Sequence, residues 1–184
     1  YGVPGDGSEE NLLRVAEHLD GQLEGIKFNL GSDSARLDAE ARAVEVLAEK
    51  LGPEIHLICE CHSGTSMEDP AVAARVFDGW PPSVVAALHP FNGPAGSWLD
   101  TLGGRIRHLH LQARENSAWL DPVPGIPSVD SGLALLAAHR FAGTASLEFV
   151  SGITAGLGPA ELLGRAGVVR EILGLSIAPF LHNP

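Results

Sequence analysis

The sequence predicts an α/β protein of the (β/α)8 TIM-barrel type, and three observations lead to that fold class. Helix-type and strand-type patterns alternate along most of the chain, as they do where each strand of a parallel sheet is followed by a crossover helix. The strand patterns are continuous apolar runs, which suits strands covered on both faces. Several of these runs end in Glu or His, and the carboxyl ends of the strands are where such barrels carry their chemistry.

Six segments have the apolar spacing or the end signals of helices. Apolar residues three and four positions apart define an amphipathic stripe in residues 38–51, and Gly52 and Pro53 stop that helix. Asp69 directly precedes Pro70, an arrangement typical of a helix start. The predicted helices are residues 11–22, 38–51, 70–77, 98–102, 130–139 and 159–173.

Short apolar runs bounded by turn residues are expected to form the strands. They are residues 26–31, 55–60, 84–89, 105–112 and 144–150, and residues 113–129 are expected to form a polar, proline-rich loop. If the strand ending at Glu60 is the fourth, the run from Ile26 is the third. The prediction is therefore one TIM-barrel domain over residues 1–184 that has strands three to eight and lacks the first two. A barrel with two open edges would be a fragment, or a partner protomer would fill the gap in a homo-oligomer.

Composition limits the classes of function. The 184 residues are 45% hydrophobic and 19% charged, as in ordinary globular proteins. A net charge of -11 disfavours nucleic-acid binding, and apolar runs such as residues 131–138 are too short to span a membrane. With two cysteines, Cys59 and Cys61, no disulfide framework is expected and a cytoplasmic location is the default.

Four strand ends carry side chains of the kind that bind metals: Glu60, His89, His110 and Glu148. In a parallel barrel these ends lie at one rim, so the four side chains are expected to converge. Two carboxylates and two imidazoles suit one divalent ion, Mn2+, Mg2+, Co2+ or Zn2+. A single Glu or His in such a place is more often structural, so the prediction depends on all four together.

Three motifs in this order resemble the sugar phosphate isomerase/epimerase superfamily, the xylose isomerase-like TIM barrels. Residues 60–65 (ECHSGT) resemble its E-x-H-x-G strand end, residues 108–112 (HLHLQ) its H-x-H-L-K-D strand, and residues 146–148 (SLE) its final S-x-E. The resemblance spans Gly31 to about Gly152. It implies a barrel that binds one divalent metal through Glu60, residue 89, His110 and Glu148. His89 departs from the family, which usually has Asp there, followed three residues on by His or Asn, here Asn92.

The expected activity is metal-dependent isomerisation or epimerisation of a sugar or related polyol-ketone. A metal that holds neighbouring carbonyl and hydroxyl oxygens makes the adjacent C–H acidic and stabilises the enediolate. Glu60 and Glu148 are the predicted acid and base. The predicted substrate-binding residues are His62, Asn92, His108, Gln112, Arg114 and Asn29. For His62 a structural role is an equal alternative, and for Arg114 a solvated side chain is the favoured alternative. His18, His56, His139 and His182 are interpreted as structural or surface residues.

Three other functions remain open at this point. A dehydratase of an inosose or 3-dehydroshikimate would use the same scaffold and expel a β-hydroxyl. A barrel of the endonuclease IV type would need more His and Asp ligands than these strand ends supply. A degenerate, non-catalytic barrel would bind a sugar or a partner without turning it over.

Overall fold

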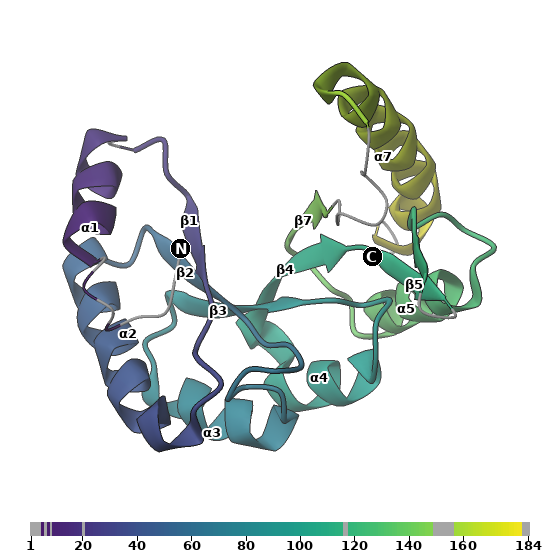
Figure 1. The fold of residues 1–184 in the computed structure, drawn as a ribbon. Coiled ribbons are helices and arrows are strands. Elements are labelled where there is room, and N and C mark those ends of the chain that lie inside the picture. Colours follow the sequence, from purple (N-terminus) through teal and green to yellow (C-terminus); the bar gives the residue numbers. More distant parts are fainter. Residues whose placement is uncertain are drawn as a thin grey trace. The chain divides into compact units, whose positions relative to one another are not determined.

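The structure is a computed structural model that describes residues 5, 7, 9–19, 21–115, 118–148 and 157–181. It forms two compact units, Tyr1–Leu88 with Asp100–Ile106, and His89–Leu99 with Arg107–Pro184. Figure 1 shows the order of the elements along the chain. Each unit is an α/β arrangement built on parallel strands, which confirms the predicted α/β class.

The first unit contains three parallel strands, β1 (Gly25–Phe28), β2 (His56–Glu60) and β3 (Val84–Leu88), with β2 in the middle. Its helices are α1 (Glu9–His18), α2 (Leu37–Leu51) and α3 (Pro70–Gly79) (Figure 1). Strand residues Phe28, Leu57 and Cys59 are fully or almost fully buried on one face. Because side chains alternate along a strand, Lys27 and Glu60 belong to the opposite face.

Aromatic packing joins the helices of this unit to its strands. The Trp80 ring, just after α3, packs edge-on against Phe77 at 4.9 Å and against Phe28 of β1 at 6.1 Å between centroids. Its Nε1–H donates to the Ala41 carbonyl of α2 at 2.9 Å. The helix and strand ends are further fixed by Arg105, whose guanidinium donates to the carbonyls of Phe77, Trp80, Pro81 and Val84.

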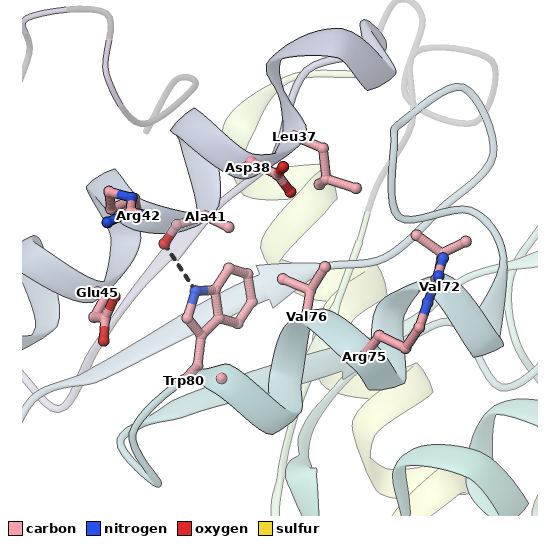
Figure 2. A pocket seen from close by; sticks show the side chains of 10 residues that line it. Leu37, Asp38, Ala41, Arg42, Glu45, Val72, Arg75, Val76 and Trp80 are labelled. Atoms are coloured by element: carbon pink, nitrogen blue, oxygen red, sulfur yellow. Dashed lines mark hydrogen bonds between the residues drawn. The ribbon is translucent and has the colours of Figure 1, made fainter.

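An open groove of about 460 Å³ lies between α2 and α3 (Figure 2). Trp80 and Val76 are among its apolar residues, and Arg42, Glu45 and Arg75 are among the charged residues that line it. None of the predicted site residues lines this groove. It is a feature of the helical layer rather than of the strand ends.

The second unit contains the parallel pair β4 (Ile106–Leu111) and β7 (Thr144–Leu147), in which His108 pairs with Thr144 and His110 with Ser146. Its helices are α5 (Pro127–Ala138) and α7 (Pro159–Leu181), and α4 (Ala95–Leu102) precedes β4 in the chain. Gly132 of α5 lies against the turn after β3, where a Cβ would meet the Pro90 carbonyl oxygen at 2.5 Å. This packing holds the turn that begins at His89.

Several predicted boundaries are wrong. The expected loop at 113–129 contains an antiparallel ribbon, β5 (Ala113–Glu115) with β6 (Ala118–Leu120). Helix α5 begins at Pro127 rather than at Asp130, since Pro fits the first helical turn. Helix α7 continues to Leu181, whereas Gly174 was expected to lie beyond its end. In the described residues five parallel strands occur, not the six that counting from strand three to eight requires.

The absence of two strands before β1 stays a prediction. The predicted strand ends at residues 149 and 150 and His182 lie outside the described residues. Within the part of the chain that is described, no helix combines the length and apolar character needed to cross a membrane.

Candidate metal centre

Three predicted metal ligands of the second unit come together in space. His89 directly follows β3, His110 lies within β4, and Glu148 directly follows β7. Nδ1 of His110 is 3.6 Å from Glu148 Oε2, and Nδ1 of His89 is 3.9 Å from the same oxygen. The two imidazole rings meet edge-on with 5.0 Å between their centroids. Each of the three offers a ligand atom, and these atoms lie within 4.8 Å of one another.

Local backbone pairing explains why Glu148 reaches this position. Its N–H donates to the Leu111 carbonyl at 3.2 Å, so the parallel pairing of β4 and β7 extends one residue past the end of β7. Side chains that alternate along a strand then place residues 146 and 148 on the same face as each other. Ser146 pairs with His110 in the register, and Glu148 therefore lies beyond His110 on that face.

The chemistry of this group fits a divalent cation. The side chains of His89 and His110 are 12% and 6% exposed, and that of Glu148 is 32% exposed. Two shielded nitrogen donors and one partly accessible carboxylate resemble the ligand sets of catalytic zinc and related ions. The carboxylate between the two imidazoles also provides the negative charge that a cation needs.

Gln112, one residue beyond β4, connects two of these side chains. Its Nε2 lies 2.7 Å from His89 Nδ1 and donates to Glu148 Oε2, also at 2.7 Å. Two buried acceptors near these residues in sequence, Gln112 Oε1 and Asn92 Oδ1, have no hydrogen-bond partner among the described residues. Because a buried polar atom without a partner is costly, these oxygens are suited to meet a donor group or an ion.

His108 is held beside His110 by hydroxyl groups of β7. Its Nδ1 lies 2.8 Å from Thr144 Oγ1, its Nε2 lies 3.0 Å from Ser146 Oγ, and its ring meets that of His110 edge-on at 5.2 Å. Both ring nitrogens thus have protein partners. This geometry fixes the His108 ring beside His110, and contact of His108 with substrate stays a prediction.

Glu60 is the predicted ligand that belongs to the first unit. Glu60 ends β2, is 5% exposed, and forms an ion pair in which Lys27 Nζ lies 2.6 Å from its Oε2. The Asn29 amide, oriented to satisfy its neighbours, places its nitrogen 2.9 Å from the same oxygen. The sequence predicts Asn29 near the substrate site but misses Lys27. Lys27 lies two residues before Asn29 on the same strand face, and this spacing could have predicted that the two lie together.

The remaining predicted residues have local partners. His62 lies in the turn after β2, where its Nδ1 is 2.7 Å from the Ser63 carbonyl oxygen. Arg114 of β5 is exposed, and its guanidinium carbon lies 5.2 Å from the centre of the Trp119 ring of β6. Of the histidines interpreted as structural, His18, His56 and His139 are exposed.

The buried thiols beside Glu60 belong to the opposite strand face. Cys59 and Cys61 are free, and their sulfur atoms are 4.0 Å apart. Burial raises the pKa of Cys59 well above its ordinary value, and the hydrogen bond to Cys61 and the Glu60 charge add to that shift. Cys59 is therefore a protonated core residue at neutral pH.

No protein-family model and no curated protein sequence matches this chain. Among solved structures, D-psicose 3-epimerase with D-tagatose from Clostridium cellulolyticum H10 is similar over 96% of this chain and 71% of that chain, with 14% identity and a TM-score of 0.66. The IOLI protein with a binding zinc atom is similar over 97% and 73% respectively, with 13% identity and a TM-score of 0.68.

A D-psicose 3-epimerase structure in the presence of D-fructose is similar over 91% of this chain and 71% of that chain, with 17% identity and a TM-score of 0.62. The resemblance inferred from the strand-end motifs is therefore confirmed at the level of fold: over most of its length the chain is similar in fold to two D-psicose 3-epimerase structures and to the IOLI protein.

Proposed function

We propose that this chain is a divalent-metal-dependent isomerase or epimerase of a sugar or a related polyol-ketone. The observation that carries the proposal is the meeting of His89, His110 and Glu148 at the ends of parallel strands. The fold shared with two sugar epimerase structures supports the substrate class, and the zinc atom of the IOLI protein supports a metal of this kind.

We assign the fourth ligand to Glu60. The support is its place at the end of β2, its near-complete burial, and its match to the E-x-H-x-G motif. A buried carboxylate that already attracts the Lys27 ammonium is a strong anionic site. A divalent ion in place of that partner would still compensate the carboxylate charge.

The protein residues would divide the work of proton transfer. When bound, a divalent ion supplies positive charge that polarises a carbonyl oxygen and makes the neighbouring C–H acidic. The Glu148 carboxylate, still 32% exposed, would remove or return a proton at that carbon. Glu60 takes the complementary acid or base role. His89 and His110 would bind without adding charge, and Asn29, His62, Asn92, His108, Gln112 and Arg114 remain the proposed contacts to substrate hydroxyls.

Solvent deuterium exchange tests this function directly. Ketohexoses and cyclic polyol-ketones are incubated in D2O with the Mn2+-loaded full chain, and carbon-bound deuterium is followed by NMR. We expect deuterium at the carbon next to the carbonyl, and loss of that exchange in Glu148→Gln. The matched control is Glu115→Gln, which changes an exposed glutamate of β5 in the same unit.

Exchange that persists in Glu148→Gln would remove Glu148 from the chemistry. Absence of exchange on every substrate, with Mn2+ bound, would contradict the isomerase proposal. If the substrate instead lost water and took up no deuterium, the proposed reaction would be dehydration rather than isomerisation.

A further inference from the structure

The Gln112 side chain forms hydrogen bonds with two proposed ligands at once. Its amide nitrogen lies 2.7 Å from His89 Nδ1 and 2.7 Å from Glu148 Oε2. The residue is 6% exposed, so water does not easily replace these bonds. The amide nitrogen therefore has one hydrogen for each of the two proposed ligands.

The Glu148 carboxylate determines which way the Gln112 amide faces. If the amide were turned over, Gln112 Oε1 would lie where the nitrogen now is, 2.7 Å from Glu148 Oε2. Two acceptor oxygens at that distance repel each other, whereas an N–H group and a carboxylate attract. The nitrogen is thus held toward Glu148, and the same nitrogen faces His89.

This orientation fixes the tautomer of His89. An amide nitrogen only donates, so His89 Nδ1 has to accept with its lone pair. A neutral imidazole has one lone pair and one N–H, and its hydrogen must then lie on Nε2. The lone pair through which a neutral histidine binds a metal is already used by Gln112.

We infer that Gln112 is a positioning residue that competes with the metal for His89. It holds the imidazole in the tautomer whose lone pair is occupied, and metal binding by His89 requires that N–H···N bond to break. Glu148 is affected less, because a carboxylate keeps further lone pairs. The inference rests on the proposed function, since it concerns the same metal centre.

The buried Gln112 Oε1 is a second and independent observation. It has no hydrogen-bond partner among the described residues. The amide nitrogen therefore forms one hydrogen bond with each proposed ligand, whereas the amide oxygen forms none with the described residues. Rotation of the Gln112 amide away from the ligands thus breaks fewer hydrogen bonds than it would if the oxygen were also bonded.

Two measurements test the inference, and the first needs no metal. Long-range 1H–15N NMR of the metal-free full chain at pH 8 reports the tautomer of His89, assigned by comparison with His89→Gln. We expect the hydrogen on Nε2. In the second, Mn2+ is titrated into the wild-type chain and into Gln112→Leu, which cannot donate. We expect Gln112→Leu to bind Mn2+ about tenfold more tightly, about 1.4 kcal/mol.

The matched control is Gln22→Leu, because Gln22 is exposed and lies outside the unit that holds His89. Its affinity for Mn2+ should equal that of the wild-type chain. A hydrogen on His89 Nδ1 in the metal-free protein, or Mn2+ binding by Gln112→Leu that is equal to or weaker than that of the wild-type chain, would overturn the inference and leave the metal site intact. Failure of all these proteins to bind Mn2+ would instead contradict the proposed function, and the tautomer would still test the inference.

Discussion

Lys27 shows at the scale of one residue how a buried carboxylate is kept in this protein. Glu60 is 5% exposed, and the Lys27 ammonium at 2.6 Å is its charged partner in the first unit. A carboxylate that loses such a partner keeps its desolvation cost, which is why breaking a buried pair costs more than the pair contributes. Lys27 itself is 41% exposed, so solvent reduces the effect.

We therefore expect Lys27→Met to lower the free energy of unfolding of the metal-free chain by about 1–2 kcal/mol. Urea denaturation measures this value. Lys50→Met is the control, because Lys50 is exposed in the last turn of α2, and such surface changes stay within about 0.5 kcal/mol. Equal stability of the two variants would show that Lys27 does not stabilise Glu60.

The contrast between Lys27 and Glu148 shows what a sequence reveals about single residues. Glu148 is predictable because Ser146-Leu147-Glu148 ends an apolar strand after a turn. Lys27 is not, since a lysine within a strand usually marks a solvent-facing position. The bond of Gln112 to His89 is also hidden, because it joins residues 23 positions apart through two strand ends.

At the scale of elements, helix α5 and the turn after β3 depend on each other. A Cβ at position 132 would lie 2.5 Å from the Pro90 carbonyl oxygen and 2.6 Å from Phe91 Cδ1. Backbone and a buried ring cannot easily yield, so only glycine allows the helix to approach so closely. The turn that this helix supports begins at His89, a proposed ligand.

Gly132→Ala should accordingly lower the free energy of unfolding by about 1–3 kcal/mol through overpacking. The matched change is Gly164→Ala in α7, where a Cβ meets nothing within 4 Å. That substitution should be neutral or stabilise by up to about 1 kcal/mol, since alanine favours helix. Thermal or urea unfolding compares the two, and the same sign for both would contradict the packing argument.

The elements differ in how well their sequences predict them. Strands β2 and β3 are predictable because their apolar runs suit burial on both faces. The β5–β6 ribbon is not, because each of its strands has three residues and its polar sequence resembles a loop. Pro127 predicts a helix start, but the amphipathic pattern that would place it is weak in a helix with apolar residues on several sides.

For the molecule as a whole, the buried Cys59 thiol links stability to alkaline pH. Its pKa is raised well above the ordinary value by burial first, then by Cys61 and Glu60. In the unfolded chain the thiol would lose its proton near about pH 8.5, whereas in the folded chain it keeps it. The unfolded state thus binds fewer protons above that pH, and the stability that Cys59 contributes is complete below it and lost above it.

We expect the free energy of unfolding to fall above about pH 9, with Cys59 contributing about 1.4 kcal/mol per pH unit. Urea denaturation between pH 7 and pH 10 under reducing conditions measures the slope. Cys59→Ala should be less stable than the wild-type chain at pH 7. Its free energy of unfolding should fall less steeply with pH, by the contribution of one titrating thiol. An unchanged slope in that variant would show that Cys59 titrates alike in both states.

The overall fold follows from the sequence more fully than the site does. Alternating helices and apolar strands predict parallel β/α units, and the solved structures of similar fold confirm that architecture. Which strand is the third or the fourth depends on counting, and the pattern of a single chain does not number its strands. The site residues could be named from strand ends, while their hydrogen-bond partners required the structure.

Calorimetry of Mn2+ binding shows whether these strand ends form a metal centre. The wild-type chain, Glu148→Gln and Glu60→Gln are titrated at pH 7, with Glu115→Gln as the exposed control. We expect one-to-one binding by the wild-type chain. Glu148→Gln and Glu60→Gln should each weaken it by about tenfold or more, about 1.4 kcal/mol, and the control should leave it unchanged. No binding by the wild-type chain, or equal affinity in Glu148→Gln, would contradict a metal centre built from these strand ends.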